Sequence, residues 1–234
     1  MQQYFKEIEN KVRVAYAVAG EARSKGLDPA SLVEIPLAIN LAERVTGLIS
    51  IKYPQVKGCG IENRIKELEK ERGFLDYSIC LQIAEEIAKE KFCKFQTLLE
   101  AIDAGIRVAF AYITLGVVSS PLEGYTHFKL KKTEKGEDYI AAYYSGPVRS
   151  AGGTGAAFSL IIIDHLREVM GYAQYDPTEE EVKRMITEMY DYHERIANLQ
   201  YLPSEKELKF LLPFMPIKLM VIQARRKKFQ IIKI

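Results

Sequence analysis

One glycine-rich segment, residues 143–154, has the residue types and spacing that could bind an anion. It reads Tyr-Tyr-Ser-Gly-Pro-Val-Arg-Ser-Ala-Gly-Gly-Thr, and a predicted strand enters it while a predicted helix leaves it. Backbone N–H groups in such a loop, together with a helix N-terminus and an arginine, can face a phosphate. The residues predicted to contact phosphate or to shape the loop are Arg149, Ser150, Gly152, Gly153 and Thr154.

The same segment fits neither the P-loop nor the dinucleotide-binding pattern. It lacks the Gly-Lys-Ser/Thr ending of a P-loop. Its glycine spacing also differs from the dinucleotide fingerprint, and no βαβ unit surrounds it. Because a tight strand-to-helix turn would explain the glycines equally well, anion binding and a purely structural turn both stay open.

Acidic residues that could hold catalytic metals do not gather in any recognisable motif. Two-metal nucleotidyl transfer needs carboxylates that converge on one site. The candidates are Glu123, Asp164, Glu188 and Asp191, and most fall on the polar side of a predicted helix. The three histidines are scattered, and His165 cannot face Asp164, its neighbour in a predicted helix. The sequence therefore predicts neither a catalytic residue nor a metal site.

Positive charge is concentrated locally. The net charge is +2, but residues 218–234 hold six basic residues and no acidic one, so the rest of the chain is mildly acidic. Nucleic acid would therefore have to bind local patches in which basic residues accompany aromatic ones. The candidates are the hairpin lysines Lys129, Lys131, Lys132 and Lys135 and the tail residues Arg225, Arg226, Lys227 and Lys228. For the hairpin, an edge strand protected from aggregation by its lysines is an equally good explanation.

The composition is that of an ordinary globular protein, with 48% hydrophobic and 27% charged residues. Residues 156–163 form the longest apolar stretch, which is too short to span a bilayer. No apolar signal-peptide core opens the chain, so we expect a cytoplasmic protein. The three cysteines, Cys59, Cys80 and Cys93, fit no zinc-binding spacing, and we expect buried or half-buried free thiols.

The first half of the chain is predicted to be a helical bundle, because apolar residues recur there at three- and four-residue spacing. The helix nearest the N-terminus carries a stripe that includes Phe5, Ile8 and Val12, and it could dock on its own domain or on another protein. The fifth helix is apolar on most sides, which places it in the centre. The helices are expected over residues 4–25, 36–49, 61–72, 75–89 and 98–115.

The second half is predicted to add a β-hairpin, giving a mainly α fold with a small β-element (α+β). Alternating, aromatic-rich runs indicate strands at 125–132 and 139–144. Helices are expected over 156–170, from a cap at Asp176 with Glu179 to about 201, and from Ser204 with Glu207 to about 212. Two further strands are expected at 217–222 and 229–234. The expected domains are 1–118, 119–217 and an unassigned basic tail, 218–234.

Several stretches, all in the same order, resemble the large subunit of archaeal family-D DNA polymerase. Residues 143–154 resemble a signature of that subunit. Further resemblances occur at residues 22–29, 33–36, 41–45, 116–124, 192–195 and 199–201. Because these matches are collinear from about residue 20 to about residue 217, the chain is identified as resembling the N-terminal region of the subunit. The basic tail is not covered.

The resemblance implies a non-catalytic module of a replicative polymerase that contributes DNA contact and subunit assembly. The family's catalytic aspartates lie in an Asn-Ala-Asp-Phe-Asp-Gly-Asp type motif of a longer chain, and these 234 residues contain no such run. The resemblance implies no cofactor in this chain, magnesium for the full polymerase, and DNA and the polymerase small subunit as partners.

Two other functions stay open. The chain could be a pure protein-interaction or oligomerisation module, with DNA contacted elsewhere in the subunit. Its first helix would then dock the small subunit or another copy of the chain. The third possibility is an independent enzyme that binds a nucleotide at residues 143–154.

Overall fold

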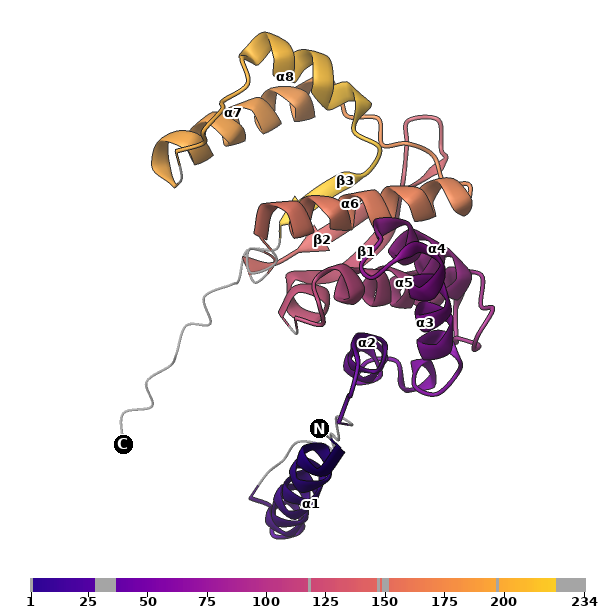
Figure 1. Cartoon of the computed structure of the whole chain (residues 1–234). Coiled ribbons are helices and arrows are strands. Elements are labelled where there is room, and N and C mark those ends of the chain that lie inside the picture. The colour runs from indigo at the N-terminus through magenta and orange to yellow at the C-terminus, as the bar shows by residue number, and fades with distance from the viewer. Residues whose placement is uncertain are drawn as a thin grey trace. The chain divides into compact units, whose positions relative to one another are not determined.

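The computed structural model of the chain describes residues 2–27, 37–117, 119–146, 148, 152–196 and 198–221. The chain divides into two compact units, Met1–Leu122 and Glu123–Ile234 (Figure 1). Helices make up most of both units, and the second adds a small sheet. The predicted fold class, mainly α with a small β-element, is therefore confirmed.

The first unit is built from helices around α5 (Leu98–Ile113). Every residue from 101 to 112 is buried, and α5 packs against both α2 and α4. The apolar fifth helix thus forms the centre of the unit, as predicted. The other elements are α1 (Gln2–Ser24), α2 (Leu41–Ile49), the 3-10 turn η1 (Pro54–Val56), α3 (Ile61–Arg72) and α4 (Tyr77–Ala88).

Close packing of α4 on α5 depends on one glycine. A Cβ atom added at Gly105 would lie 2.6 Å from the backbone carbonyl oxygen of Ala84. No side chain fits in that space without moving one of the two helices apart from the other. At its start, α5 is capped by Thr97, whose hydroxyl accepts a 3.2 Å hydrogen bond from the Glu100 N–H.

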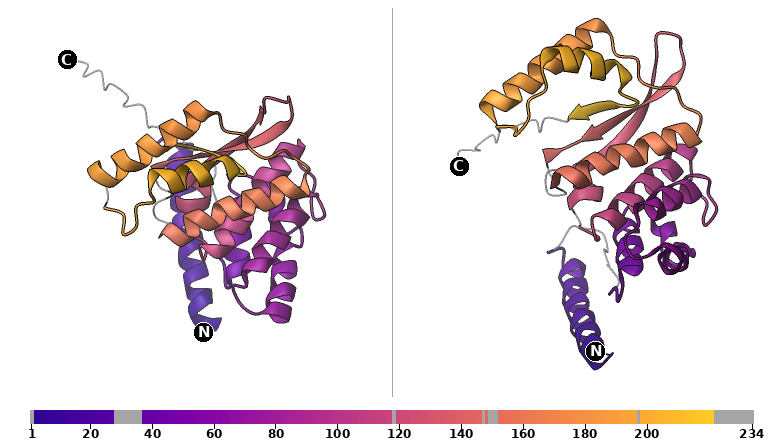
Figure 2. Two further views of the ribbon diagram at one scale, coloured as in Figure 1. Left: turned by 90° about the horizontal axis from the view of Figure 1, so that it is seen from above. Right: turned by 45° about the horizontal axis from the view of Figure 1, so that its top comes forward.

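The second unit holds a three-stranded sheet with helices on both faces (Figure 2). The strand order is β1-β2-β3, with β1 antiparallel to β2 and β2 parallel to β3. Helix α6 lies on one face, and α7 and α8 lie on the other. The elements are β1 (Tyr125–Lys132), β2 (Asp138–Tyr144), α6 (Gly152–Val169), α7 (Glu179–Arg195), α8 (Glu205–Leu211), the 3-10 turn η4 (Leu212–Phe214) and β3 (Lys218–Val221).

Successive side chains of β2 point to opposite faces of the sheet, and both faces are packed against helices. On one face, the Tyr144 hydroxyl lies 2.8 Å from the Ser159 hydroxyl of α6. On the other, Tyr139 and Ala141 are buried, and Met185 of α7 packs against their cluster. The central strand is therefore covered on both sides, which explains why it carries few charged residues.

The start of α2 was predicted too early. The predicted helix begins at residue 36, whereas residues 37–40 are not helical and α2 begins at Leu41. Asn40 caps it, because the Asn40 side-chain oxygen accepts a 3.0 Å hydrogen bond from the Glu43 N–H. Residue 36 itself lies outside the described residues.

Both ends of α7 also differ from the prediction. Thr178, and not Asp176, caps the helix, in a reciprocal capping box with Glu181. The Asp176 carboxylate instead accepts a hydrogen bond from the Glu134 N–H at 3.3 Å. The cap therefore lies two residues later than predicted, at Thr178 with Glu181 in place of Asp176 with Glu179.

The C-terminal end of α7 falls at Arg195, about six residues before the predicted end. Beyond it the Leu199 N–H donates a 3.0 Å hydrogen bond to Nδ1 of His193, which a continuing helix would not allow. The short helix α8 has the predicted capping box of Ser204 and Glu207. The strand predicted at 229–234 lies outside the described residues.

Of the helices that the structure describes, none combines the length and the apolar character needed to cross a membrane.

Candidate nucleic-acid interface

Alternation along β1 places three basic side chains on one face of the hairpin. His127, Lys129 and Lys131 alternate along the strand, so their side chains share a face. In the register of the hairpin they lie opposite Tyr143, Ala141 and Tyr139 of β2. Because β1 is an edge strand, this face borders the rim of the sheet.

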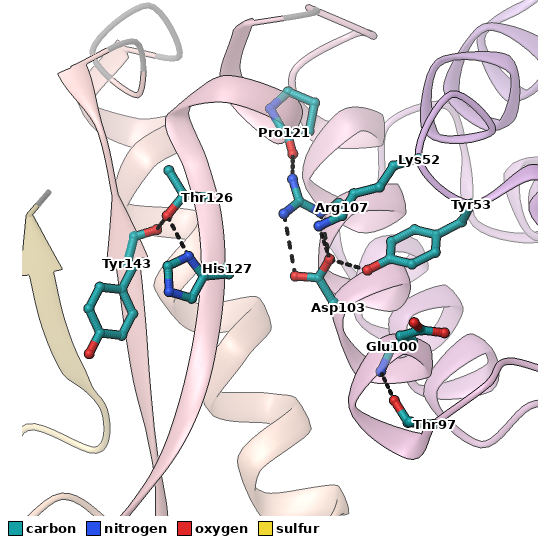
Figure 3. A network of polar contacts seen from close by, with 10 residues as sticks. All are labelled: Lys52, Tyr53, Thr97, Glu100, Asp103, Arg107, Pro121, Thr126, His127 and Tyr143. Atoms are coloured by element: carbon teal, nitrogen blue, oxygen red, sulfur yellow. Dashed lines mark hydrogen bonds and ion pairs between the residues drawn. The ribbon is translucent and has the colours of Figure 1, made fainter. Parts of the chain in front are cut away.

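The Tyr143 ring lies among these basic side chains. The His127 ring stacks on it in parallel, with centroids 4.5 Å apart and an interplanar angle of 9° (Figure 3). The ammonium groups of Lys129 and Lys131 lie 5.6 and 6.0 Å from its centroid, within the range of cation–π attraction. We call His127, Lys129, Lys131 and Tyr143 the basic–aromatic cluster.

A local irregularity fixes the position of His127. The register of β1 on β2 shifts between Tyr125 and His127, which is the mark of a bulge. The Thr126 hydroxyl donates a 2.9 Å hydrogen bond to the Tyr143 carbonyl and lies 3.1 Å from Nδ1 of His127 (Figure 3). Thr126 thus links the His127 ring to the backbone of β2 at Tyr143.

The opposite edge of the sheet carries a lysine that is already neutralised. Lys218 of β3 forms an ion pair with Glu181 of α7, and its ammonium lies 4.9 Å from the Tyr175 ring centroid. Burial tends to raise the pKa of Glu181, but the hydrogen bonds from Lys218 and from the Thr178 N–H outweigh it and lower the pKa to about 2. The positive charge of Lys218 is therefore neutralised by Glu181 within the second unit.

Lys129 and Lys131 differ in this respect. Neither forms an ion pair with any residue that the structure describes, and Lys129 is exposed. Two such ammoniums beside stacked rings can contact phosphates and the faces of bases. The lysines also protect an edge strand from pairing with another chain, which is the second role predicted from the sequence.

Lys132, another of the predicted hairpin lysines, lies apart from the cluster. Lys132 follows Lys131 and therefore points to the other face of β1. There it forms a 2.9 Å ion pair with Asp138, the first residue of β2. Sequence reasoning considered His127 only as a metal ligand and missed its stacking role. Its cross-strand pairing with Tyr143 could have been found from the predicted hairpin register.

The predicted phosphate loop is described only in part. Gly152, Gly153 and Thr154 were predicted to shape a loop, but they form the first turn of α6, which begins four residues before the predicted start. Gly153 and Thr154 are exposed. Arg149, Ser150, Arg225 and Arg226 lie outside the described residues.

The stripe of the first helix is partly covered. Phe5, Ile8 and Val12 are half-buried, whereas most other residues of α1 are exposed. No described residue of α1 is fully buried. The predicted apolar face therefore exists, and part of its area remains accessible.

Three of the four acidic residues considered for catalysis form local ion pairs within helices. Asp164 lies 2.7 Å from Arg167, and Glu188 lies 3.4 Å from Arg184. Asp191 lies 3.6 Å from Arg195. The cysteines are free and buried or half-buried, as predicted.

A buried ion pair that the sequence analysis missed lies in α5. Asp103 and Arg107 are nearly inaccessible, and Nε of Arg107 lies 2.7 Å from the Asp103 carboxylate (Figure 3). That carboxylate also accepts hydrogen bonds from Lys52 at 2.8 Å and from the Tyr53 hydroxyl at 2.6 Å. The Arg107 guanidinium donates another hydrogen bond to the Pro121 carbonyl. This pair could have been predicted from the sequence, because Asp103 and Arg107 lie four residues apart in a mostly apolar helix.

Stretches that carried the family resemblance hold one another in place. Nε of Arg44, within residues 41–45, donates a 3.2 Å hydrogen bond to the Gly116 carbonyl, within residues 116–124. The Ser145 N–H, within residues 143–154, donates to the Gly124 carbonyl at 2.8 Å. In the second unit, the bond between Leu199 and His193 joins the last two stretches. These hydrogen bonds thus join, within each unit, stretches of sequence that carried the family resemblance.

Comparison with known proteins agrees with that pattern. Residues 3–228 match the protein family described as DNA polymerase II large subunit DP2, N-terminal. The chain belongs to this family. The resemblance to the N-terminal region of the archaeal family-D large subunit is thereby confirmed. The match includes residues 218–228, the start of the basic tail that the resemblance left uncovered.

Individual members of the DNA polymerase II large subunit family match over nearly the whole chain. The protein of Nanoarchaeum equitans is 42% identical over 216 residues, which cover 92% of this chain and 17% of that protein. The protein of Methanosarcina barkeri is 39% identical over 217 residues, covering 93% and 18%. For Thermococcus kodakarensis the identity is 35% over 221 residues, covering 94% and 12%. The chain thus spans less than a fifth of these relatives.

Proposed function

We propose that this chain serves as a non-catalytic module of a DNA polymerase large subunit, and that the basic–aromatic cluster is its contact with DNA. The carrying observation is the Tyr143 ring stacked on His127 with the ammoniums of Lys129 and Lys131 beside it. Family membership supports the choice of DNA as the partner, because the relatives are named as polymerase subunits.

The chemistry of the cluster suits binding without sequence preference. Lysine ammoniums contact backbone phosphates and release counterions, so affinity falls as salt rises. Aromatic rings stack on any base that is exposed, and such stacking contributes about 1–3 kcal/mol per base. We therefore expect salt-dependent binding in which the lysines set the salt slope and Tyr143 adds affinity.

Catalysis belongs to other parts of the polymerase in this proposal. Within the part of the chain that the structure describes, no three histidine, cysteine, aspartate or glutamate side chains are grouped so as to hold a metal ion. The full polymerase would use magnesium held by carboxylates outside these residues. The polymerase small subunit and the remainder of the large subunit are the expected protein partners.

A salt series with fluorescently labelled duplex and single-stranded DNA tests the DNA contact. Replacing both Lys129 and Lys131 by glutamine should lower the slope of log K against log salt by up to about 1.8 on duplex DNA. Tyr143→Ala should weaken binding by about tenfold with little change in slope. The control replaces Lys89 and Lys94, which are paired with glutamates in the first unit, by glutamine.

A wild-type slope near zero would refute DNA contact. So would a slope for the hairpin variant that equals that of the control. Arg149→Ala tests the glycine-rich segment separately, because its predicted phosphate contact should also reduce the slope by about 0.9. An unchanged slope in that variant would remove Arg149 from the interface and leave the basic–aromatic cluster of the hairpin as the contact.

The alternative function, a pure interaction module, is favoured by the half-buried stripe of α1. Sedimentation velocity separates the two. Oligomers that disappear when residues 1–26 are deleted, together with undetectable DNA binding, would support the interaction module.

A further inference from the structure

Two cysteine thiols lie next to each other in the first unit. Cys59 and Cys93 are free and half-buried, and their side chains interact directly as hydrogen-bond partners. Cys59 belongs to the turn that precedes α3, and Cys93 belongs to the loop that joins α4 to α5. We call these two segments the α3 turn and the α4–α5 loop. The third cysteine, Cys80, is fully buried within α4.

The α3 turn and the α4–α5 loop also meet through two further contacts. The rings of Tyr53 and Phe95 are in edge contact, with centroids 5.9 Å apart. A Cβ atom added at Gly60 would lie 3.9 Å from the Phe92 ring. Gly60 follows Cys59 directly, and Phe92 precedes Cys93. The two sulfur atoms are therefore neighbours within a packed contact between the two segments.

The α3 turn holds Cys59 in one place and leaves space beside it. Gly58 and Gly60, on either side of Cys59, have φ values of 71° and 104°, which residues with a side chain rarely adopt. The Cys59 thiol donates a 3.1 Å hydrogen bond to the Val56 carbonyl. A Cβ atom added at Gly58 would meet no atom within 4 Å, so a small molecule can approach this turn.

The α4–α5 loop is likewise fixed around Cys93. The Glu90 carboxylate accepts a 2.9 Å hydrogen bond from the Phe95 N–H and forms a 3.0 Å ion pair with Lys94. These contacts enclose the segment that contains Cys93. Because both thiols are positioned in the folded chain, joining them costs little further ordering.

A peroxide can join two such thiols in two steps. The thiolate of the first cysteine attacks the peroxide, so that a sulfur–oxygen bond forms, the oxygen–oxygen bond breaks, and one oxygen leaves as water. The second thiol then attacks the sulfenic acid. A sulfur–sulfur bond forms, the sulfur–oxygen bond breaks, and the released hydroxide takes the thiol proton and leaves as water. Two thiols are oxidised to a disulfide while one hydrogen peroxide is reduced to two water molecules.

The surroundings assign the two steps to different cysteines. Burial, followed by the negative charge of a Cys59 thiolate, raises the pKa of Cys93 to about 12. Cys93 therefore keeps its proton at neutral pH. Since the thiolate is the nucleophile, the attack on the peroxide falls to Cys59, and Cys93 closes the disulfide.

We propose that Cys59 and Cys93 are a redox-sensitive pair, which a peroxide converts into a disulfide that ties the α3 turn to the α4–α5 loop. Such a cross-link restricts the unfolded chain, so the first unit becomes more stable when it is oxidised. The proposal is independent of the DNA contact, because the pair lies in the first unit and the basic–aromatic cluster lies in the second.

Titration of the reduced chain with hydrogen peroxide, followed by peptide mass spectrometry, tests the pair. We expect a loss of about 2 Da, the mass of two hydrogen atoms. A tryptic digest without reductant should then contain residues 58–64 linked to residues 92–94. The melting temperature of the first unit should rise by about 5 °C or more, and dithiothreitol should reverse both changes.

Three serine variants provide the comparison. Cys80→Ser is the matched control, because it removes the buried cysteine, and it should form the link as wild type does. Cys59→Ser and Cys93→Ser should show neither the link nor the rise in melting temperature. Circular dichroism establishes that each variant is folded.

The decisive measurement uses wild-type chain and therefore does not depend on the variants. If iodoacetamide still labels both Cys59 and Cys93 after peroxide treatment of folded chain, the proposal is wrong. It is also wrong if sedimentation velocity shows that the disulfide joins two copies of the chain. A link within one chain that leaves the melting temperature unchanged would contradict the proposed tie between the α3 turn and the α4–α5 loop.

Discussion

Replacing Arg107 by methionine should destabilise the first unit at neutral pH. Methionine keeps much of the apolar volume of the side chain but removes the charge that faces Asp103 inside α5. The carboxylate, whose side chain is 8% exposed, is then left buried with a poorer set of partners. Removing one member of a buried ion pair costs about 3–5 kcal/mol.

The remaining contacts place the expected loss at the lower end of that range, at about 3 kcal/mol. Lys52 and the Tyr53 hydroxyl still bond to Asp103 in the variant. The Lys52 side chain is 41% exposed, however, so its attraction is screened by water and contributes at most about 1 kcal/mol. The Pro121 carbonyl also loses its donor.

Urea unfolding followed by circular dichroism measures this loss. A change of about 3 kcal/mol moves the midpoint of the first unit by about 2 M, with a typical dependence of 1–3 kcal/mol per M. A second variant that combines Asp103→Leu with Arg107→Met should recover much of the stability, because no uncompensated charge is then buried.

The pH dependence gives an independent check. Burial tends to raise the pKa of Asp103, but the Arg107 charge and the hydrogen bonds of Arg107 and Lys52 outweigh it, so its pKa lies below the ordinary value of 3.8. The stabilisation it gives is therefore present above pH 3.8 and is lost as the pH falls through the lowered pKa. Without Arg107, burial dominates and raises the pKa. The difference in stability between wild type and variant should therefore shrink as the pH falls, first through the raised pKa of the variant and then through the lowered pKa of wild type. A loss under 1 kcal/mol, or one that is equal at pH 7 and pH 3.5, would refute this reasoning.

Three further predictions concern packing, capping and charge. Gly105→Ala should lower the melting temperature and cost about 1–3 kcal/mol, because the new Cβ meets the Ala84 carbonyl; an unchanged melting curve would contradict the close approach. Thr178→Ala should cost about 1 kcal/mol and increase hydrogen exchange in the first turn of α7, whereas an unaltered exchange rate would argue against this cap. Glu181→Gln should weaken the bond between α7 and Lys218. Since the pKa of Glu181 is about 2 instead of 4.5, its stabilisation acts above pH 4.5 and disappears toward pH 2, so the variant's deficit in urea titrations should vanish there.

The sequence predicted element types better than their ends, and the reasons are local. The bounds of α3 and β1 match the predicted ones because an apolar periodicity and a turn coincide there. For α7, two overlapping caps competed, and no sequence rule decides between Asp176 and Thr178. The C-terminal end of α7 depends on the hydrogen bond from the Leu199 N–H to the His193 ring. Helix periodicity in the sequence does not reveal such a contact.

The candidate interface was predicted as a set of lysines and not as a cluster. Alternation separates Lys131 from Lys132, but the sequence does not say that α7 packs on the face of the sheet that carries Lys131 and Tyr143. The pairing of His127 with Tyr143 follows the register of the rest of the hairpin, whereas the bulge shifts only the pairing beyond it, at Tyr125. The ion pair of Asp103 and Arg107 was missed because acid–base pairs four residues apart usually lie on a helix surface.

The parallel pairing of β3 beside β2 sets an order of events during synthesis. β2 ends at Tyr144, and the strand that covers its second edge begins at Lys218. A ribosome must therefore make α6, α7 and α8 before this edge of β2 can be closed. A fragment cut at Pro216 would keep the hairpin and its cluster, yet it would expose the backbone groups of β2 and invite pairing with another chain. Proteolytic or cloning boundaries for the second unit therefore belong after Val221.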